Sequence, residues 1–300
     1  MNIRDVEYFA VIAEQRHMGR AAQELGLSAP ALSKSLQRLE KSAKTRLVLR
    51  TPKGIELTPA GMTLLSHVGR LRLSLQDVAR EIADLGEGRA GLLRMGVHPV
   101  LVDDLLAPAC EALLQAAPNV QLSVTVEITD VTIAAVRAGE LDFAFTTLPQ
   151  NAPDDLEHEH LLDDHVVVFA AKNHRLAGRK KVSLAEVADE KWVITALNTQ
   201  PGWAWLHSVF DAARLQPSQI AVRTNSLDLR NRLVASGGFL GFMSRMSLQR
   251  HANSLGLVEI PVDGMKWRRR IGITHRRNAY LTPAARRMIE LLKEACGRPR

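Results

Sequence analysis

Near the start of the chain, the spacing of apolar and polar positions predicts two helices joined by a tight turn. Ala22 is small enough to allow close packing of the helices, and Gly26 permits the sharp turn between them. Ser28 is a favourable N-cap for the second helix, whose first turn tolerates Pro30. The pattern therefore predicts a helix-turn-helix.

The second of these helices separates its apolar side chains from its polar and basic ones. One face carries Leu32, Leu36 and Leu39. The opposite face carries Pro30, Ser33, Lys34 and Gln37. A short polar and basic face, on a helix held from behind by leucines, fits the major groove of DNA. Helix pairs with a solvated polar face are also common in proteins that do not bind DNA, so this face alone leaves both interpretations open.

A small hairpin is predicted directly after this helix. Residues 48–50 and 55–57 are strand-like, and residues 51–54 form the turn between them. Arg50 and Lys53 place positive charge on the hairpin, which suits contacts with DNA phosphates. The order of helix, tight turn, capped helix and basic hairpin favours a winged DNA-binding domain over a plain helix pair.

An apolar seam runs along a long helix that is predicted after Thr58, its expected N-cap. Pro59 suits the first position of this helix. The apolar positions that follow are separated alternately by four and three residues, which is the a/d spacing of a coiled coil. They are Leu64, Val68, Leu71, Leu75, Val78, Ile82 and Leu85. We expect this seam to join two copies of the chain, although a helix packed against its own core would show a similar pattern.

From residue 92 onward, short apolar strands alternate with helices. This alternation predicts an α/β fold with a parallel sheet that is covered by helices on both faces. The expected strands are residues 92–97, 120–128, 141–146, 165–171, 220–224 and 239–243, and the expected helices are residues 102–116, 131–138, 203–214, 227–236 and 283–295. A weak internal repeat indicates two similar α/β lobes, with crossovers near residues 148–164 and 261–267.

The 300-residue chain carries a net charge of +7 that is unevenly distributed. Residues 1–60 contain ten Lys and Arg against six Asp and Glu, whereas residues 87–267 contain sixteen against twenty-one. A basic head on an acidic body is expected when only the head meets DNA phosphates. Residues 268–300 contain ten basic residues against two acidic ones, and the arginines that flank the strand-like run 271–274 predict a solvated strand face.

The N-terminal stretch resembles that of the LysR-type transcriptional regulators. The positions that match the family pattern are Ala21, Ala22, Leu25, Ser28, Pro30, Ala31, Leu32, Ser33, Leu36, Leu39, Glu40, Arg50, Leu57, Thr58, Ala60 and Gly61. The chain departs from the pattern at Ala29, where the family usually has a base-contacting Gln, and at Lys34, where Arg is common. The resemblance implies an all-α winged helix-turn-helix head, a long linker helix and two α/β lobes similar to those of periplasmic solute-binding proteins.

The expected organisation follows from this resemblance and from the predicted elements. The winged helix-turn-helix is expected in residues 1–58, a dimerising linker helix in residues 59–86 and a hinge in residues 87–91. Effector lobe I is expected in residues 92–161 and 268–300, and effector lobe II in residues 162–267. The resemblance also implies a homodimer that commonly assembles further into a homotetramer.

The predicted contacts with double-stranded DNA lie on the second helix and the hairpin. We expect Lys34 and Gln37 to read bases, and Arg20, Arg50 and Lys53 to bind phosphates. The full predicted set is Arg20, Ser28, Pro30, Ser33, Lys34, Gln37, Arg38, Arg50, Thr51 and Lys53. Because a coiled-coil dimer places two heads on successive groove faces, the operator is expected to be a near-palindrome.

A small polar or anionic effector is expected where the carboxyl ends of the strands meet helix N-termini. Each residue at such a position is more often a plain helix cap, but together these residues would line one cleft from both lobes. The predicted set is His98, Pro99, Val100, Thr129, Thr147, Asn198, Thr199, Gln200, Asn225 and Ser226. The resemblance implies that binding there shifts the closure of the lobes and the setting of the DNA-binding heads.

Motifs of several enzyme classes are absent from the sequence. There is no G-x-S-x-G elbow, Walker A, H-E-x-x-H or C-x-x-C motif. Residues 86–91 formally fit G-x-G-x-x-G, but a predicted helix precedes them and a strand follows, which is the reverse of a dinucleotide site. We therefore expect a hinge there, no cofactor and no enzymatic activity. An NAD-type enzyme, or a small-molecule-binding protein whose helical head does not bind DNA, is the alternative.

The remaining features favour a bacterial-type regulator in the cytoplasm. Residues 154–165 combine histidines with carboxylates, but their spacing fits no metal template, so an acidic crossover loop is expected there instead of a metal site. Cys110 and Cys296 are too few for a disulfide framework and suit a reducing compartment. Neither a signal peptide nor a membrane-spanning run is apparent, so no membrane partner is expected.

Overall fold

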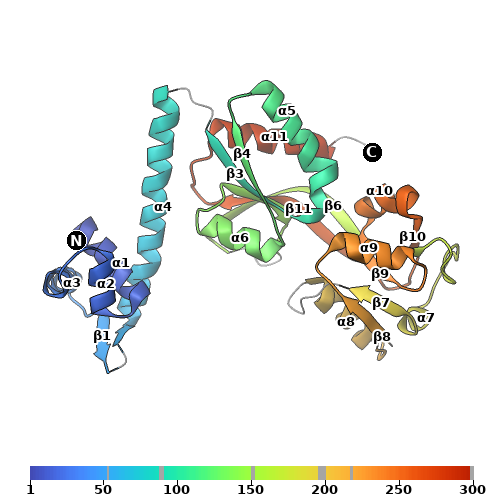
Figure 1. Cartoon of the computed structure of the whole chain (residues 1–300), viewed down its shortest axis with the longest axis horizontal. Coiled ribbons are helices and arrows are strands. Elements are labelled where there is room, and N and C mark those ends of the chain that lie inside the picture. The colour runs from blue at the N-terminus through green and yellow to red at the C-terminus, as the bar shows by residue number, and fades with distance from the viewer. Residues whose placement is uncertain (53, 88–90, 150–152, 195–200, 217–218, 298–300) are drawn as a thin grey trace. The chain divides into compact units, whose positions relative to one another are not determined.

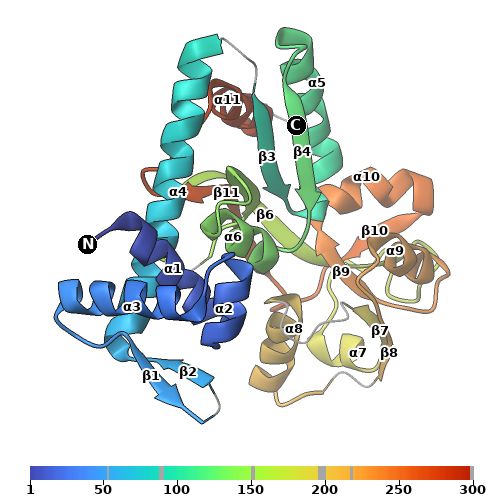
Figure 2. The ribbon, with the colours of Figure 1, turned by 60° about the vertical axis from the view of Figure 1, so that its left-hand side comes forward.

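The computed structural model consists of two compact units (Figures 1 and 2). It describes residues 1–52, 54–87, 91–149, 153–194, 201–216 and 219–297. Unit 1 comprises residues 1–91 together with residues 278–282, and unit 2 comprises residues 92–277 and 283–300.

Unit 1 contains the predicted helix-turn-helix and hairpin. Its elements are α1 (Ile3–Gln15), α2 (Met18–Glu24), α3 (Ala29–Ala43), β1 (Val48–Thr51), β2 (Gly54–Leu57) and α4 (Pro59–Glu87). Gly26 has φ +65° in the turn between α2 and α3, a left-handed conformation that glycine adopts without steric cost. The Ser28 hydroxyl accepts a hydrogen bond from the backbone N–H of Ala31, which confirms the predicted N-cap.

The leucine face of α3 is buried, as its spacing predicts. Leu32, Leu36 and Leu39 pack with Phe9 and Ile12 of α1 in one apolar cluster. Val48 and Ile55 join this cluster from the hairpin, and Val68 joins it from α4. The burial of one face fixes the opposite face of α3 on the outside of unit 1, next to the β1–β2 hairpin (Figure 2).

Unit 2 contains a seven-stranded mixed sheet and a separate two-stranded parallel sheet. The strands are β3 (Leu92–Val97), β4 (Gln121–Val126), β5 (Phe143–Thr147), β6 (Leu156–Ala171), β7 (Lys191–Ile194), β8 (Gln219–Arg223), β9 (Gly241–Ser244), β10 (Leu257–Ile260) and β11 (Trp267–Arg276). The large sheet has the order β10–β6–β11–β5–β3–β4, with β9 also paired to β6, while β7 and β8 form the small sheet. The prediction of a purely parallel sheet is wrong, because β6 pairs antiparallel with β9, β10 and β11.

The acidic crossover predicted at residues 154–165 is not a loop, because the strand β6 begins at Leu156 and itself runs from one lobe into the other. Its acidic side chains face basic partners on β11: Arg268 bonds to Asp163, and Arg269 bonds to Asp164. Two histidines of the same run also have partners: His158 Nδ1 lies 2.8 Å from Thr274 Oγ1 of β11, and His160 Nε2 lies 3.3 Å from Asp163 Oδ1. Polar and charged residues occupy this strand because a second strand, more than a hundred residues later in the chain, neutralises them.

The carboxyl half of β6 is apolar on both faces because both are covered. Val166, Val168 and Ala170 belong to one core cluster. Val167 and Phe169 belong to another, on the opposite face of the strand. A strand buried on both faces gives a continuous apolar run, which is why this half was predictable from sequence.

The helices of unit 2 surround these strands. They are the 3-10 turn η1 (Pro99–Leu101), the π-helical turn η2 (Val102–Leu106), α5 (Ala107–Ala116), α6 (Thr129–Arg137), α7 (Leu184–Ala188), α8 (Pro201–Ala212), α9 (Leu227–Ala235), α10 (Arg245–Leu255) and α11 (Pro283–Gly297). The predicted helix 102–116 is therefore two segments, and α7 and α10 were not predicted. Figure 1 shows α5 and α11 on one side of β3 and β4, with α6 on the other.

We define lobe I as β3–β5 with η1, η2, α5, α6 and α11, and lobe II as β7–β10 with α7–α10. The long strands β6 and β11 pair along ten residue positions and run into both lobes. Gly272 lies where the β6–β11 register shifts, and an added Cβ there would approach the Glu159 backbone oxygen to 2.0 Å. Both lobes therefore share one sheet instead of being joined only by loops.

Two alanine substitutions in α4 should have opposite effects on unit 1. At Gly61 an added Cβ would lie 2.0 Å from the backbone oxygen of Leu47, so we expect Gly61→Ala to destabilise unit 1 by about 1–3 kcal/mol. At Gly69 nothing lies within 4 Å of the added Cβ, so Gly69→Ala should stabilise α4 by about 0.5–1 kcal/mol through helix propensity. Hydrogen–deuterium exchange of α1–α3 in the full-length protein measures both effects, and equal protection in the two variants would contradict the close approach at Gly61.

Candidate functional site

The outer face of α3 presents a small set of exposed polar side chains. Pro30, Lys34 and Gln37 are exposed there, while Leu32 and Leu36 are buried on the opposite face. This is the arrangement that the sequence predicts for a helix that enters a groove.

The hairpin is tied to this face by a side-chain hydrogen bond. Arg50 of β1 donates from Nη2 to the hydroxyl of Ser33, at 2.9 Å. The Thr51 hydroxyl donates to the backbone oxygen of Gly54 at 3.3 Å and so stabilises the turn. Predicted residue Lys53 lies outside the described residues. Two of the predicted phosphate- and base-facing positions, Arg50 and Ser33, are thus brought together.

Arg38 is held by α1 instead of projecting freely. Its Nη2 lies 2.6 Å from Asp5 Oδ1 and its Nε 3.2 Å from Asp5 Oδ2. Asp5 is buried and also accepts a hydrogen bond from the hydroxyl of buried Ser35. The Arg38 guanidinium is the main group that holds the pKa of Asp5 below its usual value, with a further contribution from Ser35. This network fixes the rotation of α3 against α1.

Arg20 lies on the exposed surface of α2, close to the turn before that helix. Its Nη2 donates to the backbone oxygen of Gln15 at 2.8 Å. This bond uses one nitrogen of the guanidinium. Because Arg20 is exposed, its remaining N–H groups suit a contact with a phosphate.

The apolar seam of α4 divides into a buried and an exposed part. Val68 is buried and Leu64 packs against the same head core. The next four positions of the seam are exposed, at 41% for Leu71, 48% for Leu75, 48% for Val78 and 63% for Ile82. A regular row of exposed large apolar side chains is unusual on a helix surface unless it packs against a partner.

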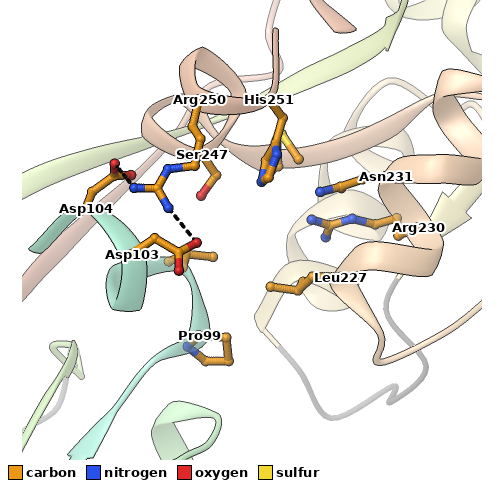
Figure 3. Close-up of a pocket in the computed structure, with 11 residues that line it drawn as sticks. Pro99, Asp103, Asp104, Leu227, Arg230, Asn231, Ser247, Arg250 and His251 are labelled. Atoms are coloured by element: carbon orange, nitrogen blue, oxygen red, sulfur yellow. Dashed lines mark hydrogen bonds and ion pairs between the residues drawn. The ribbon is translucent and has the colours of Figure 1, made fainter. Parts of the chain in front are cut away.

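A small cavity of about 50 Å³ lies between the two lobes of unit 2 (Figure 3). Lobe I contributes the residues that follow β3, and lobe II contributes α9, α10 and Met243 of β9. The lining residues are Pro99, Val100, Asp103, Asp104, Leu227, Arg230, Asn231, Met243, Ser247, Arg250 and His251. At one edge an ion pair joins the lobes, since Arg250 Nη1 lies 2.6 Å from Asp103 Oδ2 and its Nη2 bonds to Asp104.

The structure brings two of the predicted effector residues, Pro99 and Val100, to this cavity. The others have local roles: Ser226 caps α9 by accepting from the N–H of Leu229, and Thr129 Oγ1 lies 2.7 Å from Thr146 Oγ1. Thr147 ends β5, and Asn225 is exposed before α9. The predicted residues Asn198, Thr199 and Gln200 lie outside the described residues.

His98, at the end of β3, is neutral in its surroundings. Its Nδ1 accepts from the backbone N–H of Val100 at 3.4 Å and caps η1. Desolvation, and then the positive charge of Arg269, lower the pKa of His98 to about 3. The imidazole is therefore uncharged at neutral pH, and His98 adds a neutral hydrogen-bonding group near the start of the cavity wall.

Two family models match the chain. The LysR substrate binding domain matches residues 86–297, and the bacterial regulatory helix-turn-helix protein, lysR family, matches residues 3–62. The chain belongs to the LysR family.

Known members of the LysR family are similar along nearly the whole chain. The HTH-type transcriptional regulator IlvR of Caulobacter vibrioides is 30% identical over 281 residues, which cover 90% of this chain and 93% of that protein. The DNA-binding transcriptional dual regulator OxyR of Escherichia coli is 26% identical over 297 residues, or 98% and 95% of the two chains. Full-length CbnR, solved in complex with target DNA, has a TM-score of 0.59 at 19% identity, covering 98% of this chain and 100% of that chain.

Two further findings concern membranes and metals. Across the described residues, no helix combines the length and apolar character that a bilayer span requires. In the same part of the chain, no group of three His, Cys, Asp or Glu side chains is placed to hold a metal ion.

The cavity of this LysR-family chain includes residues that the sequence analysis missed. Arg230 and Asn231 lie one turn beyond the predicted Ser226, and Ser247, Arg250 and His251 lie on α10, which was not predicted. A signal was present at Arg230, because it shares the helix face of Leu227 and Val234, and a charge within an apolar stripe indicates a buried charge.

We expect Asp5→Asn to loosen α3 from α1, because it removes the charge that binds Arg38. Because Arg38 is mostly exposed, solvent screens its attraction to Asp5, so the expected loss of stability at neutral pH is about 0.5–1.5 kcal/mol, the contribution of a typical hydrogen bond. The pKa of Asp5 is lowered in the folded state, so this contribution is present above its unfolded pKa of about 4 and disappears as the pH falls through the folded value.

Differential scanning calorimetry of the full-length protein between pH 7 and pH 3.5 checks this expectation. The difference between wild type and Asp5→Asn should be largest at pH 7 and should shrink toward the acid end. Glu7→Gln, which removes an exposed carboxylate from the same helix, is the matched control. A constant difference across this range would show that the charge of Asp5 is not what stabilises α3.

Proposed function

We propose that the protein is a sequence-specific, DNA-binding transcriptional regulator whose activity is modulated by a small molecule bound between the two lobes. One observation carries the proposal: in a LysR-family chain, the polar face of α3 is exposed and the face behind it is fixed by buried leucines. The family models describe a regulatory protein, so this function is favoured over the NAD-type enzyme. Because such a regulator acts on chromosomal DNA, we propose that it works in the cytoplasm.

In the proposed complex α3 lies in the major groove. Lys34 and Gln37 would read base edges, because their side chains are exposed on the outer face of α3. Arg20, Arg50 and Lys53 would bind phosphates beside the groove and set the orientation of the head. Arg38 would act chiefly by orienting α3, since Asp5 binds its guanidinium.

We further propose a homodimer that pairs through the exposed part of the α4 seam, from Leu71 to Ile82. Burying this row against a second copy removes apolar surface from water, which favours association by about 25 cal/mol per Å² of surface buried. Two heads attached to paired α4 helices would meet two half-sites, so the proposed operator is a near-palindrome. A tetramer requires a second interface, for which the α4 seam gives no support.

The proposed effector acts by favouring one arrangement of the lobes. A ligand shifts such an equilibrium only by as much as its affinity differs between the two arrangements. The cavity walls come from both lobes, and the Arg250 ion pairs already join them at its edge. A ligand that contacts both walls would therefore bind the closed arrangement more tightly. For this role we propose the division into lobe I at residues 92–161 and 268–300 and lobe II at residues 162–267.

Footprinting of the purified full-length protein on its own upstream region tests the DNA-binding proposal. We expect protection of a near-palindromic site, and Lys34→Ala should weaken binding to that site about tenfold to a hundredfold because a base contact is lost. Binding to random DNA should weaken much less, since only one positive charge is removed from the non-specific interface.

The control for this measurement is Lys180→Ala, which makes the same change in charge at an exposed position in unit 2. It should leave both affinities unchanged. Equal weakening of the two affinities by Lys34→Ala would reassign this residue to a phosphate contact. No preference of the wild type for any upstream site over random DNA would contradict the proposed function.

Leu75→Glu tests the dimer seam. A carboxylate at this position would be buried against its counterpart in the second copy, so we expect the dimer to dissociate and the mass to fall from twice 33.1 kDa toward 33.1 kDa. Sedimentation equilibrium measures the mass. Gln76→Glu adds the same charge at the neighbouring exposed position and should remain dimeric. A Leu75→Glu protein that is still dimeric would place the interface elsewhere.

A further inference from the structure

Arg230 is a buried charge of α9 to which the described part of the chain provides no counter-ion. Only 6% of the residue is exposed, and its Nε has no hydrogen-bond partner. Its guanidinium carbon lies 5.9 Å from the centre of the Phe169 ring. Because an unpaired buried charge is costly, a group of this kind is expected to have a partner when the protein functions.

The side chain of Arg230 points into the inter-lobe cavity. Figure 3 shows the Arg230 guanidinium and the Asn231 amide nitrogen extending in the same direction, toward the wall formed by lobe I. Ser247 and His251 line the same cavity from α10. Hydrogen-bond donors from two helices therefore converge on one small space.

The carboxylates on the opposite wall are already bound. Arg250 contacts Asp103 at 2.6 Å through Nη1 and bonds to Asp104 through Nη2 (Figure 3). A single guanidinium thus holds both acidic side chains at the edge of the cavity. The positive charge of Arg230 is left facing the interior.

The guanidinium of Arg269, which is only partly exposed, increases the positive potential at Arg230. Burial, and then the charge of Arg269, lower the pKa of Arg230 to about 10, so Arg230 is still protonated at neutral pH. Arg269 is paired with Asp164, which also accepts a hydrogen bond of 2.7 Å from the hydroxyl of Ser244. The buried carboxylate of Asp164 is therefore paired with Arg269, and the charge of Arg230 is left near the like charge of Arg269.

We propose that Arg230 binds the acidic group of the effector, and that the effector is a small anion bearing a carboxylate or another oxyanion. A guanidinium binds such groups through two parallel, charge-assisted hydrogen bonds. The cavity volume of about 50 Å³ suits a group of this size. Calling the anion an effector rests on the proposed function, whereas its binding at Arg230 does not.

Arg230→Met, which keeps an unbranched apolar stem but removes the charged guanidinium, tests the site. Full-length protein is titrated with acetate, pyruvate, succinate, benzoate, phosphate and sulfate at constant ionic strength, with chloride as the reference. Binding is followed by isothermal titration calorimetry and by the thermal midpoint. We expect at least one oxyanion to bind the wild type, and its affinity to fall about tenfold to a hundredfold in Arg230→Met. The control, Arg232→Met, removes an exposed arginine of the same helix and should bind as the wild type does.

The stability of the protein in chloride alone gives a second readout. Because Arg230→Met removes an unpaired buried charge, its thermal midpoint without oxyanion should equal or exceed that of the wild type. A lower midpoint would assign Arg230 a structural role and overturn the proposal. Binding of no oxyanion in the panel, or equal binding by wild type and Arg230→Met, would also overturn it.

DNA binding by the same preparations separates this inference from the proposed function. Wild type and Arg230→Met should both retain the upstream DNA fragment in chloride, since α3 is unchanged. Anion binding that depends on Arg230, without DNA binding, would support the anion site and contradict the regulator. DNA binding without any dependence on Arg230 would support the regulator and contradict the anion site.

Discussion

The antiparallel pairing of β6 with β11 is the interaction on which the arrangement of unit 2 depends. Both strands run through both lobes, so one ladder positions the end of β3 on one side of the cavity and α9 on the other. The pairing brings together charged side chains from distant parts of the sequence, such as Arg269 and Asp164. Near its middle, Gly272 allows a close approach of the two backbones where the register shifts. The cavity therefore has walls from both lobes because the sheet passes beneath both.

The helix-turn-helix of unit 1 depends on a comparable constraint within a smaller region. Three leucines fix which face of α3 is buried, and Asp5 fixes the rotation of that helix by binding Ser35 and Arg38. Side chains on the opposite face can then present a fixed pattern of hydrogen-bonding groups without ordering a flexible segment first. This link from buried packing to an exposed polar face is what makes α3 a suitable element for reading DNA in the proposed complex.

The local sequence pattern predicted many of the helices and strands. It failed where pairing between strands that are distant in the sequence determines the structure. Three features could be predicted from a few neighbouring residues: the leucine spacing of α3, the N-cap at Ser28 and the apolar run of β6. In each case a short stretch determines which face is buried or where the helix begins. The first half of β6 was missed because its acidic residues are compatible with a strand only when Arg268 and Arg269 of β11 lie opposite. Arg230 was missed for a related reason. Capping rules select residues that precede α9, whereas Arg230 lies one turn inside the helix.

A buried charge without a counter-ion in the described chain has a consequence for how the proposed switch would work. Without an anion, bringing the lobes together around Arg230 removes water from its charge and opposes closure. An oxyanion bound at Arg230 would make this contribution to the free energy of closure favourable, because closure would then strengthen a charge-assisted hydrogen bond by excluding water from it. The ligand would thus bind the closed arrangement with higher affinity, which is the differential affinity that any effector requires. The Arg250 pairs with Asp103 and Asp104 join the lobes independently of Arg230. These ion pairs therefore make a constant contribution to the free energy of closure, and the charge of Arg230 makes the contribution that depends on the anion.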